Sequence, residues 1–228
     1  MKLPDEHKLD NPAWHALSET HQHLALNFGN IKCYQPSYSS FGGFQFPIDN
    51  TNYIDFLNGT SGSFYLIGEY PAISSPLFIK KELVCLQMVI NHKIDLPIKD
   101  DIIQLQPLHA GPLFNLQNKV QPGYFKSDTN LLGNYYGIFK NDQLVASTGE
   151  RMKMNAITEV SGVVTHPLHV GKGYAAQLVT LAVNNILDEN KNACLHVVES
   201  NTAAISLYQK LGFTTRRKIS FWQIATTA

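Results

Sequence analysis

The sequence predicts an α/β protein in two parts, a smaller and less regular α/β domain over residues 1–98 and a more regular domain over residues 99–228. Two observations predict this class and division. In the second part, three strand patterns are followed by a helix, a strand, a helix and a last strand, an order in which helices cover a mixed sheet. Between the parts, residues 93–101 carry Pro97 among charged residues, which indicates a linker.

The first part begins with a pattern that predicts a helix over residues 12–27. Asn11 and Pro12 are a capping residue and a first-turn proline, apolar residues follow at helical spacing, and Gly29 ends the pattern. Short strands are expected further along, over residues 31–35, 64–68 and 83–90. The Gly-, Ser- and Pro-rich stretches between them predict turns, over residues 39–46, 59–63 and 71–76.

The second part predicts a helix over residues 112–121 and then a hairpin. The hairpin strands, 135–140 and 143–151, meet at Asn141-Asp142, a pair that favours tight turns. The remaining pattern predicts strands and helices in alternation, with strands over residues 158–165, 193–198 and 213–224 and helices over residues 173–189 and 202–211.

The charge of the chain excludes functions that depend on a charge excess. The 228 residues include 18 Lys+Arg and 18 Asp+Glu, so the chain has no net charge with which to bind nucleic-acid phosphates or an acidic membrane. The two parts of the chain differ in net charge. Residues 1–98 hold 6 basic and 9 acidic side chains, and residues 99–228 hold 12 basic and 9 acidic side chains.

The cysteines and the N-terminal segment predict a cytoplasmic protein. Cys33, Cys85 and Cys194 are far apart, which suits a reducing compartment. The first ten residues are polar where a secretory signal is apolar, and no apolar run reaches the ~18 residues of a membrane span. We therefore expect neither a membrane nor a nucleic acid as partner.

The strongest chemical signal is a strand, a glycine-containing turn and a long helix. The strand ends at Val163-Val164-Thr165, and the helix opens at Val170-Gly171-Lys172-Gly173-Tyr174-Ala175. Backbone N–H groups and the helix dipole favour an anion such as a pyrophosphate at this point. The spacing matches neither the P-loop nor the dinucleotide-binding pattern. A plain connection between strand and helix is the alternative.

These residues resemble the pyrophosphate loop of the GNAT superfamily of acyl-CoA-dependent N-acyltransferases, Gln/Arg-x-x-Gly-x-Gly/Ala. Gly173 and Ala175 match its last two fixed positions, whereas Val170 lacks the side-chain donor of the first. Residues 198–213 are similar to the segment that completes the cofactor site, and the two motifs together cover about residues 131–224. The resemblance implies the GNAT fold, a mixed, mostly antiparallel, twisted sheet flanked by helices.

Four short runs are similar to a bacterial group of predicted GNAT acetyltransferases that carries an additional N-terminal region. The runs are residues 149–152, 158–160, 165–167 and 207–213. The N-terminal region has no assigned role in that group, and a degenerate copy of the GNAT fold is one interpretation of it.

The resemblance implies that Glu159 is the catalytic base. Glu159 lies eleven residues before Val170, where GNAT enzymes that use a strand glutamate carry it, and Glu150 and Glu199 are weaker alternatives. Strand alternation places Glu159 on one face with Ser161 and Val163 unless a bulge at Gly162 intervenes. The structural alternative is a surface glutamate paired with Lys153 or Arg151.

The resemblance also implies that Tyr208 is the catalytic acid that protonates the coenzyme thiolate. Tyr208 follows Asn201 by seven residues, and Asn201 and Ala204 match the family segment as well. The structural alternative is a half-buried aromatic residue of the core.

The resemblance further implies which residues bind acetyl-CoA. The strand residues offer backbone groups to pantetheine, the loop binds the pyrophosphate, and Asn201 orients pantetheine or caps the following helix. The full set is Val163, Val164, Thr165, Val170, Gly171, Lys172, Gly173, Tyr174, Ala175, Asn201 and Ala204. No metal is expected, because His166 and His169 have no third ligand at suitable spacing.

The hypothesis from the sequence is an N-acetyltransferase that moves an acetyl group from acetyl-CoA to a primary amine, on a small molecule or a peptide, by direct attack in a ternary complex. The acidic first part is a hypothesis for attracting a cationic amine. A non-catalytic acyl-CoA-binding or protein-interaction module with the same fold is the alternative. Both a monomer and a homodimer agree with the sequence.

Overall fold

The computed structural model describes residues 3–48, 54, 57 and 64–226. The strands of this part of the chain are β1 (Ala25–Phe28), β2 (Ile31–Tyr34), β3 (Phe41–Phe44), β4 (Phe64–Gly68), β5 (Leu77–Ile90), β6 (Ile102–Gln104), β7 (Tyr135–Lys140), β8 (Gln143–Lys153), β9 (Ile157–Thr165), β10 (Asn192–Val198) and β11 (Thr214–Thr226). The α-helices are α1 (Pro12–Ser18), α3 (Ala110–Val120), α4 (Tyr174–Asp188) and α5 (Thr202–Lys210). Short 3-10 helices lie at Glu6–Asp10, Gln22–Leu24, Pro107–His109, Thr129–Leu131 and Pro167–His169.

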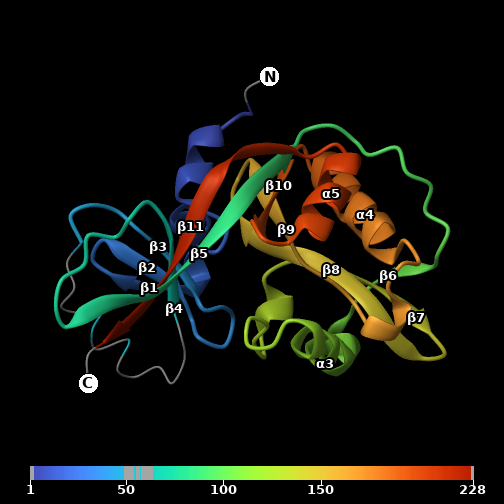
Figure 1. The fold of residues 1–228 in the computed structure, drawn as a ribbon, viewed down its shortest axis with the longest axis horizontal. Helices are drawn as coiled ribbons and strands as arrows, with labels where there is room; N and C mark the ends of the chain where they lie inside the picture. Colours follow the sequence, from blue (N-terminus) through green and yellow to red (C-terminus); the bar gives the residue numbers. More distant parts are fainter. Residues whose placement is uncertain (1–2, 49–53, 55–56, 58–63, 227–228) are drawn as a thin grey trace.

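Within the described residues the strands form one sheet of eleven strands, in the order β1-β2-β3-β4-β11-β5-β10-β9-β8-β7-β6. Two neighbouring pairs, β3–β4 and β9–β10, are parallel, and the other neighbours are antiparallel. The predicted class, a mixed and mostly antiparallel sheet flanked by helices, is therefore confirmed (Figure 1).

The long strands β5 and β11 connect the two parts of the chain. β5 pairs with β10 on one side and with β11 on the other, and β11 also pairs with β4. A buried cluster contains residues from both sides of the expected boundary, among them Leu17, Tyr34, Met152 and Phe221. The boundary near residue 98 falls in the extended segment between β5 and β6, and the division into two domains stays a prediction.

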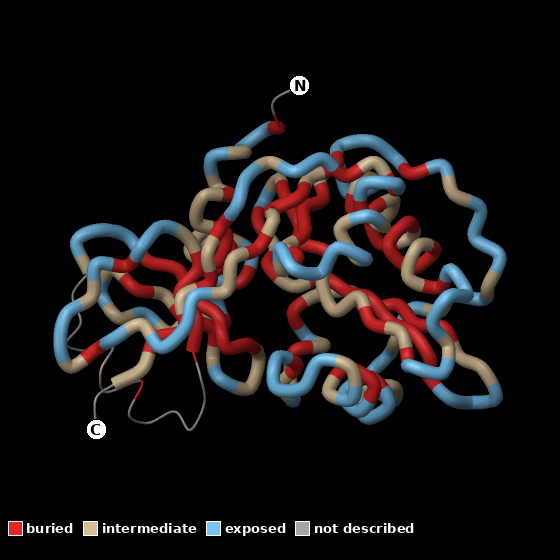
Figure 2. Tube along the Cα trace, viewed as in Figure 1, coloured by how far each residue is buried: buried red, intermediate tan, exposed pale blue. Residues whose placement is uncertain are grey.

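Helices cover both faces of the sheet around β8 and β9. α4 packs on one face through a stripe that includes Leu178, Ala182 and Ile186, and α3 packs on the other through Leu113 and Leu116 (Figure 1). Figure 2 shows that buried residues follow the sheet and the inward sides of these helices. The predicted elements from residue 112 onward are confirmed, with end shifts of one to two residues.

The helix expected over residues 12–27 is wrong beyond Ser18. The chain turns there and buries His21, whose ring nitrogens hydrogen-bond the Tyr34 hydroxyl at 2.8 Å and the Leu132 carbonyl oxygen at 2.9 Å, and residues 25–28 are strand β1. The turn expected over residues 39–46 contains strand β3, and β6 was not expected at all. The turn expected over residues 59–63 lies outside the described residues.

Candidate active site

A cavity of about 340 Å³ lies where two parallel strands separate. β9 and β10 are paired from Ile157 and Asn192 up to Glu159 and Cys194, and no further pair follows. Beyond that point Val160 to Val163 form one wall of the cavity and Leu195 to Val198 form another. Because the strands diverge, they leave space between them in which an extended ligand can lie along β9.

A β-bulge at Gly162 shapes the β9 wall. Ser161 pairs with Gly149 and Val164 with Ser147, so three steps along β9 face two steps along β8. Gly162 has φ +61°, a conformation that favours glycine, so a bulge does interrupt the strand alternation expected from Glu159 to Val163. Gln117 of α3 holds the bulge by donating to the Gly162 carbonyl oxygen at 2.7 Å.

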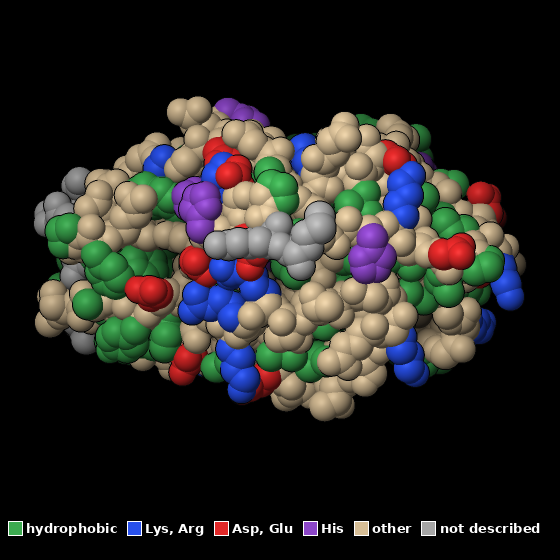
Figure 3. Space-filling model, turned by 90° about the horizontal axis from the view of Figure 1, so that it is seen from above, with side chains coloured by type: hydrophobic (Ala, Val, Ile, Leu, Met, Phe, Trp, Pro, Cys, Tyr) green, Lys and Arg blue, Asp and Glu red, His purple; other side chains and the backbone are tan. Residues whose placement is uncertain are grey.

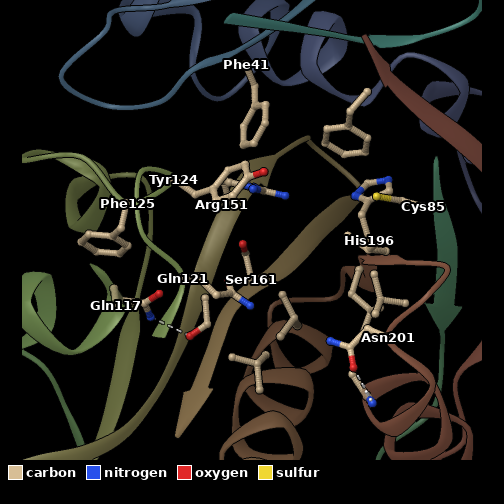
Figure 4. A pocket seen from close by; sticks show the side chains of 18 of the residues that line it. Phe41, Cys85, Gln117, Gln121, Tyr124, Phe125, Arg151, Ser161, His196 and Asn201 are labelled. Carbon is tan, nitrogen blue, oxygen red and sulfur yellow. Dashed lines mark hydrogen bonds between the residues drawn. The ribbon is translucent and has the colours of Figure 1, made fainter. Parts of the chain in front are cut away.

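The remaining walls come from distant parts of the chain and are rich in aromatic rings (Figure 4). The aromatic lining residues are Phe41, Tyr124, Phe125, Tyr135, Tyr208 and Phe221. The polar or sulfur-bearing ones are Cys85, Gln117, Gln121, Thr129, Arg151, Ser161, His196 and Asn201. Among the described residues no acidic side chain lines the cavity, so the described acidic residues of the first part lie outside it.

Arg151 is fixed at the cavity by the buried Glu159. Its Nε donates to Glu159 Oε2 at 2.8 Å and its Nη2 donates to Oε1 at 2.6 Å. The Met152 N–H donates to Oε2 at 3.3 Å, and the His196 ring donates from Nδ1 to Oε1 at 2.7 Å. Four donors therefore surround one carboxylate.

Gln87 sets the tautomer of His196. The Gln87 side-chain oxygen accepts from Arg216 Nη1 at 2.8 Å, so its Nε2 faces the Leu9 carbonyl oxygen at 2.7 Å and His196 Nε2 at 3.0 Å. His196 Nε2 is thus an acceptor, and Nδ1 carries the proton that is donated to Glu159.

The surroundings of Glu159 differ from those of a base that contacts substrate. Glu159 is 0% exposed and does not line the cavity. Burial by itself raises the pKa of Glu159, but the Arg151 guanidinium and the hydrogen bonds from Arg151 and His196 outweigh burial and lower this pKa to about 2. The sequence analysis gave a surface glutamate paired with Lys153 or Arg151 as the structural alternative. Glu159 does pair with Arg151, but it is buried and not on the surface.

The alternative glutamates also lie away from the cavity. Glu150 is buried, and its carboxylate accepts from Lys153 Nζ at 2.6 Å and from the Asn134 N–H at 3.1 Å. Glu199 is paired with Lys218 at 2.6 Å on the surface. Neither lines the cavity.

Four of the expected site residues line the cavity. They are Val163 of β9, Asn201 at the N-cap of α5, and Ala204 and Tyr208 within α5. Tyr208 is 7% exposed, and burial raises its pKa to about 12. Within the described residues no hydrogen bond of its hydroxyl is present. Asn201 caps α5, because its Oδ1 accepts from the Ala204 N–H at 3.2 Å.

The glycine loop lies beyond the end of β9 and does not line the cavity. Gly171 and Gly173 have φ values of +78° and +77°, and no atom lies within 4 Å of a Cβ built on either. Their backbone is therefore open to a ligand at the N-terminus of the 15-residue α4. Lys172 is exposed, Val164 is buried, and Val170 is 64% exposed. Thr165 is the last residue of β9, Tyr174 and Ala175 are the first residues of α4, and all three lie outside the cavity lining.

Arg151 and His196 were missed as cavity residues by sequence reasoning, as were the rings of Phe41, Tyr124 and Phe221. No local motif marks them, because they reach the cavity from separate strands and loops. Among the described residues no group of three or more His, Cys, Asp or Glu side chains is placed to hold a metal ion. None of the helices described here is long and apolar enough to cross a bilayer.

The basic run of β11 is occupied by ion pairs away from the cavity. Arg216 bonds Glu6 and Asp10, Arg217 bonds Asp10, and Lys218 bonds Glu199. Figure 3 shows Lys and Arg side chains beside Asp and Glu side chains on the face seen from above.

Comparisons with known proteins agree with the fold. The model of a family described as FR47-like protein matches residues 135–222. The chain is similar to the crystal structure of a protein from Novosphingobium aromaticivorans DSM 12444 assigned to the GNAT family of acetyltransferases, with 27% identity, a TM-score of 0.89, and coverage of 97% of this chain and 100% of that chain. No curated protein matches.

Two more distant structures share the fold. A GCN5-related N-acetyltransferase from Kribbella flavida has 13% identity and a TM-score of 0.62, and covers 92% of this chain and 95% of its own. A GCN5-related N-acetyltransferase-like protein from Streptococcus suis 89/1591 has 12% identity and a TM-score of 0.63, with coverage of 91% and 92%.

The two parallel strands separate beside the cavity, and a glycine loop precedes α4. Together with these similarities, they agree with the fold of GNAT-type acyltransferases. The family-model match over residues 135–222 and the similarity to the Novosphingobium protein over the whole chain support assignment to the GNAT superfamily of acyl-CoA N-acyltransferases.

Proposed function

We propose that the protein is an N-acetyltransferase that transfers an acetyl group from acetyl-CoA to a primary amine by direct attack in a ternary complex. One observation carries the proposal. The residues matched to the coenzyme site, Asn201, Ala204 and Tyr208, open into the same cavity as Arg151 and the aromatic walls. A donor and an acceptor can therefore meet in one space.

The chain offers groups for each part of acetyl-CoA, which supplies the reactive thioester when bound. The backbone N–H groups around Gly171 and Gly173, with the dipole of α4, suit the pyrophosphate. Val163, Val164 and Thr165 suit pantetheine, because β9 has no strand partner on the β10 side beyond Glu159. Lys172 and Tyr174 flank the phosphate position, and Val170 and Ala175 contribute backbone only.

Tyr208 is proposed as the acid. Acyl transfer forms a bond from the amine nitrogen to the carbonyl carbon and breaks the bond from that carbon to sulfur, so the departing sulfur needs a proton. Burial holds the pKa of Tyr208 at about 12, which keeps the hydroxyl protonated at neutral pH. Tyr208 lines the cavity between β9 and β10, and its protonated hydroxyl has a proton to give.

We assign Glu159 a positioning role in place of that of a base. A carboxylate with a pKa of about 2 and four donors around it has little tendency to take a proton from an amine. Glu159 instead orients Arg151 and His196 toward the cavity. We propose that the amine loses its proton to water, and that the nearby positive guanidinium lowers the pKa of the amine.

Release of coenzyme A from acetyl-CoA over a panel of amines tests the proposal, together with calorimetric titration of acetyl-CoA. Turnover on at least one primary amine is the expected result. Val170, which lacks the side-chain donor of the family loop, favours the second candidate, a non-catalytic acyl-CoA-binding module. Binding of acetyl-CoA without turnover on any amine would support that candidate instead.

A further inference from the structure

Arg151 is the one lysine or arginine that lines the cavity in the described part of the chain, and no acidic side chain lines it. Glu159 balances its charge from behind, with a side chain that is 1% exposed, whereas the side chain of Arg151 is 16% exposed. The positive end of this ion pair therefore faces the cavity. A ligand in the cavity meets a positive potential in a region of low dielectric constant.

One edge of the guanidinium remains available. Nε and Nη2 donate to Glu159, and among the described residues no hydrogen bond of Nη1 is present. The guanidinium carbon lies 4.5 Å from the centre of the Phe41 ring, which fixes the plane of the group. An arginine with a fixed plane and a free edge suits a carboxylate, because two parallel N–H groups match its two oxygens.

The other walls indicate what the carboxylate is attached to. Phe41 and Tyr124 lie near Arg151 (Figure 4). Phe125, Tyr135 and Phe221 line the same cavity. These rings favour an apolar or aromatic group on the ligand. The volume of about 340 Å³ is at the lower end of the range for ligand pockets, so the part of the acceptor that enters is small.

From these contacts we infer that the acceptor is a free amino acid with an aromatic or other apolar side chain, whose α-carboxylate is held by Arg151 and whose α-amine is acetylated. The inference rests on the proposed function and adds the substrate class to it. A carboxylate on the acyl group of the donor, as in succinyl-CoA, would bind Arg151 through the same chemistry. The donor comparison below distinguishes this source of the carboxylate from the acceptor.

The first test measures binding without turnover. The full chain is titrated calorimetrically with N-acetyl-L-phenylalanine and with N-acetyl-L-phenylalaninamide, which lacks the negative charge. We expect the acid to bind ~10- to 100-fold more tightly, the factor that corresponds to a hydrogen bond with a charged group. Equal affinities, or tighter binding of the amide, would overturn the inference, and this result needs no variant.

The second test compares rates for L-phenylalanine, L-phenylalaninamide and phenethylamine with acetyl-CoA. The amine of the amide is less basic and would react faster at neutral pH if the carboxylate were not recognised. A higher kcat/KM for phenylalanine therefore supports recognition. A higher kcat/KM for the amide or for phenethylamine than for phenylalanine would overturn the inference and leave the proposed function standing. Absence of turnover on every amine would instead defeat the proposed function, and the titration would still decide the carboxylate site.

Variants connect the preference to Arg151. Arg151→Met alone leaves the Glu159 charge buried and unpaired, so Arg151→Met is combined with Glu159→Gln to remove both charges. In this double variant we expect the acid-to-amide affinity ratio to fall to about 1. Arg217→Met is the matched control, because Arg217 is an exposed arginine outside the cavity, and it should keep the ratio. An unchanged ratio in a folded double variant would overturn the role of Arg151.

The donor is varied in the same assay. Acetyl-CoA and succinyl-CoA are compared with phenethylamine as acceptor. If succinyl-CoA is preferred in a manner that depends on Arg151, the carboxylate belongs to the donor and the inference about the acceptor is overturned. Equal rates, or a preference for acetyl-CoA, support it.

Discussion

Arg151 on β8 and Glu159 on β9 form a two-pronged ion pair across neighbouring strands, with Nε–Oε2 and Nη2–Oε1 distances of 2.8 and 2.6 Å. The pair lies at the point where β9 and β10 separate, since Glu159 and Cys194 are their last paired residues. One interaction thus stabilises the sheet where pairing ends and directs a guanidinium into the cavity. Its removal should affect stability first and catalysis through the position of Arg151.

We expect Glu159→Gln to lower the free energy of unfolding by ~3 kcal/mol at pH 7, because it leaves a buried guanidinium without its charge partner. The pKa of Glu159 is lower in the folded state, about 2, than its ordinary value of 4.5. Its contribution to stability is therefore present above pH ~4.5 and is lost as pH falls toward 2. Denaturant unfolding of both proteins between pH 7 and 3 should show the difference narrowing.

Glu199→Gln is the matched control for this experiment. Glu199 forms an exposed pair with Lys218, so the change in free energy should stay within about 1 kcal/mol. A Glu159→Gln protein that is as stable as the wild type but inactive would argue for the direct base role.

Tyr208→Phe should lower kcat by ~100-fold or more and leave the acceptor KM nearly unchanged, because only the proton donor for the leaving sulfur is removed. Coenzyme A release at saturating acetyl-CoA measures both constants. Tyr70→Phe, at a tyrosine that is 61% exposed and outside the cavity, is the control and should behave as the wild type. An effect of Tyr208→Phe confined to KM would contradict the acid role.

The glycine loop should be sensitive to Gly171→Ala and Gly173→Ala through backbone conformation. Both glycines have positive φ, and alanine is disfavoured there by ~1–2 kcal/mol. We expect both substitutions to weaken acetyl-CoA binding in calorimetric titrations. Gly111→Ala is the control. A Cβ added at Gly111 also has no atom within 4 Å, but Gly111 is in helix α3, where alanine is favoured, so this variant should keep its acetyl-CoA affinity and its stability. Unaltered affinity in both loop variants would remove the loop from the coenzyme site.

Cys85→Ala should retain turnover within a few-fold, although Cys85 lines the cavity. Burial raises the pKa of the Cys85 thiol to about 12, so almost no thiolate is available to form an acyl-enzyme at neutral pH. Mass spectrometry of the protein mixed with acetyl-CoA alone should show no mass increase at Cys85. A stable acetyl adduct there, with parallel lines in initial-rate plots, would contradict direct attack.

The pH dependence of kcat/KM should follow the acceptor. If water takes the proton, kcat/KM rises with pH until the amine is deprotonated, and the midpoint shifts from one acceptor to another with the pKa of the amine. The measurement uses two amines of different basicity. A midpoint that is the same for both would indicate a titrating base on the protein.

The sequence predicted the second part of the fold more accurately than the first. From β7 to β11 each strand and helix has a local signal of its own, such as the Asn141-Asp142 turn, where both residues have positive φ. In the first part, tertiary contacts override the local pattern. Strand β3 contains Gly42 and Gly43, which resemble a turn in sequence, but a Cβ on Gly43 would collide with Trp14 of α1. These glycines allow α1 to pack directly on the strand.

By itself, the sequence determined the order of the elements in the second part, the glycine loop before α4 and the tyrosine of α5, because each depends on residues that are close together in the chain. It left open whether a bulge interrupts β9 at Gly162. Only the tertiary structure decided that Glu159 is enclosed by Arg151 and His196, and that Phe41, Tyr124 and Phe221 form walls around the same space. Buried charges need partners, and in this protein the partners come from different strands of the sheet. Most of these residues are far apart in sequence, so no local sequence pattern predicts that they meet.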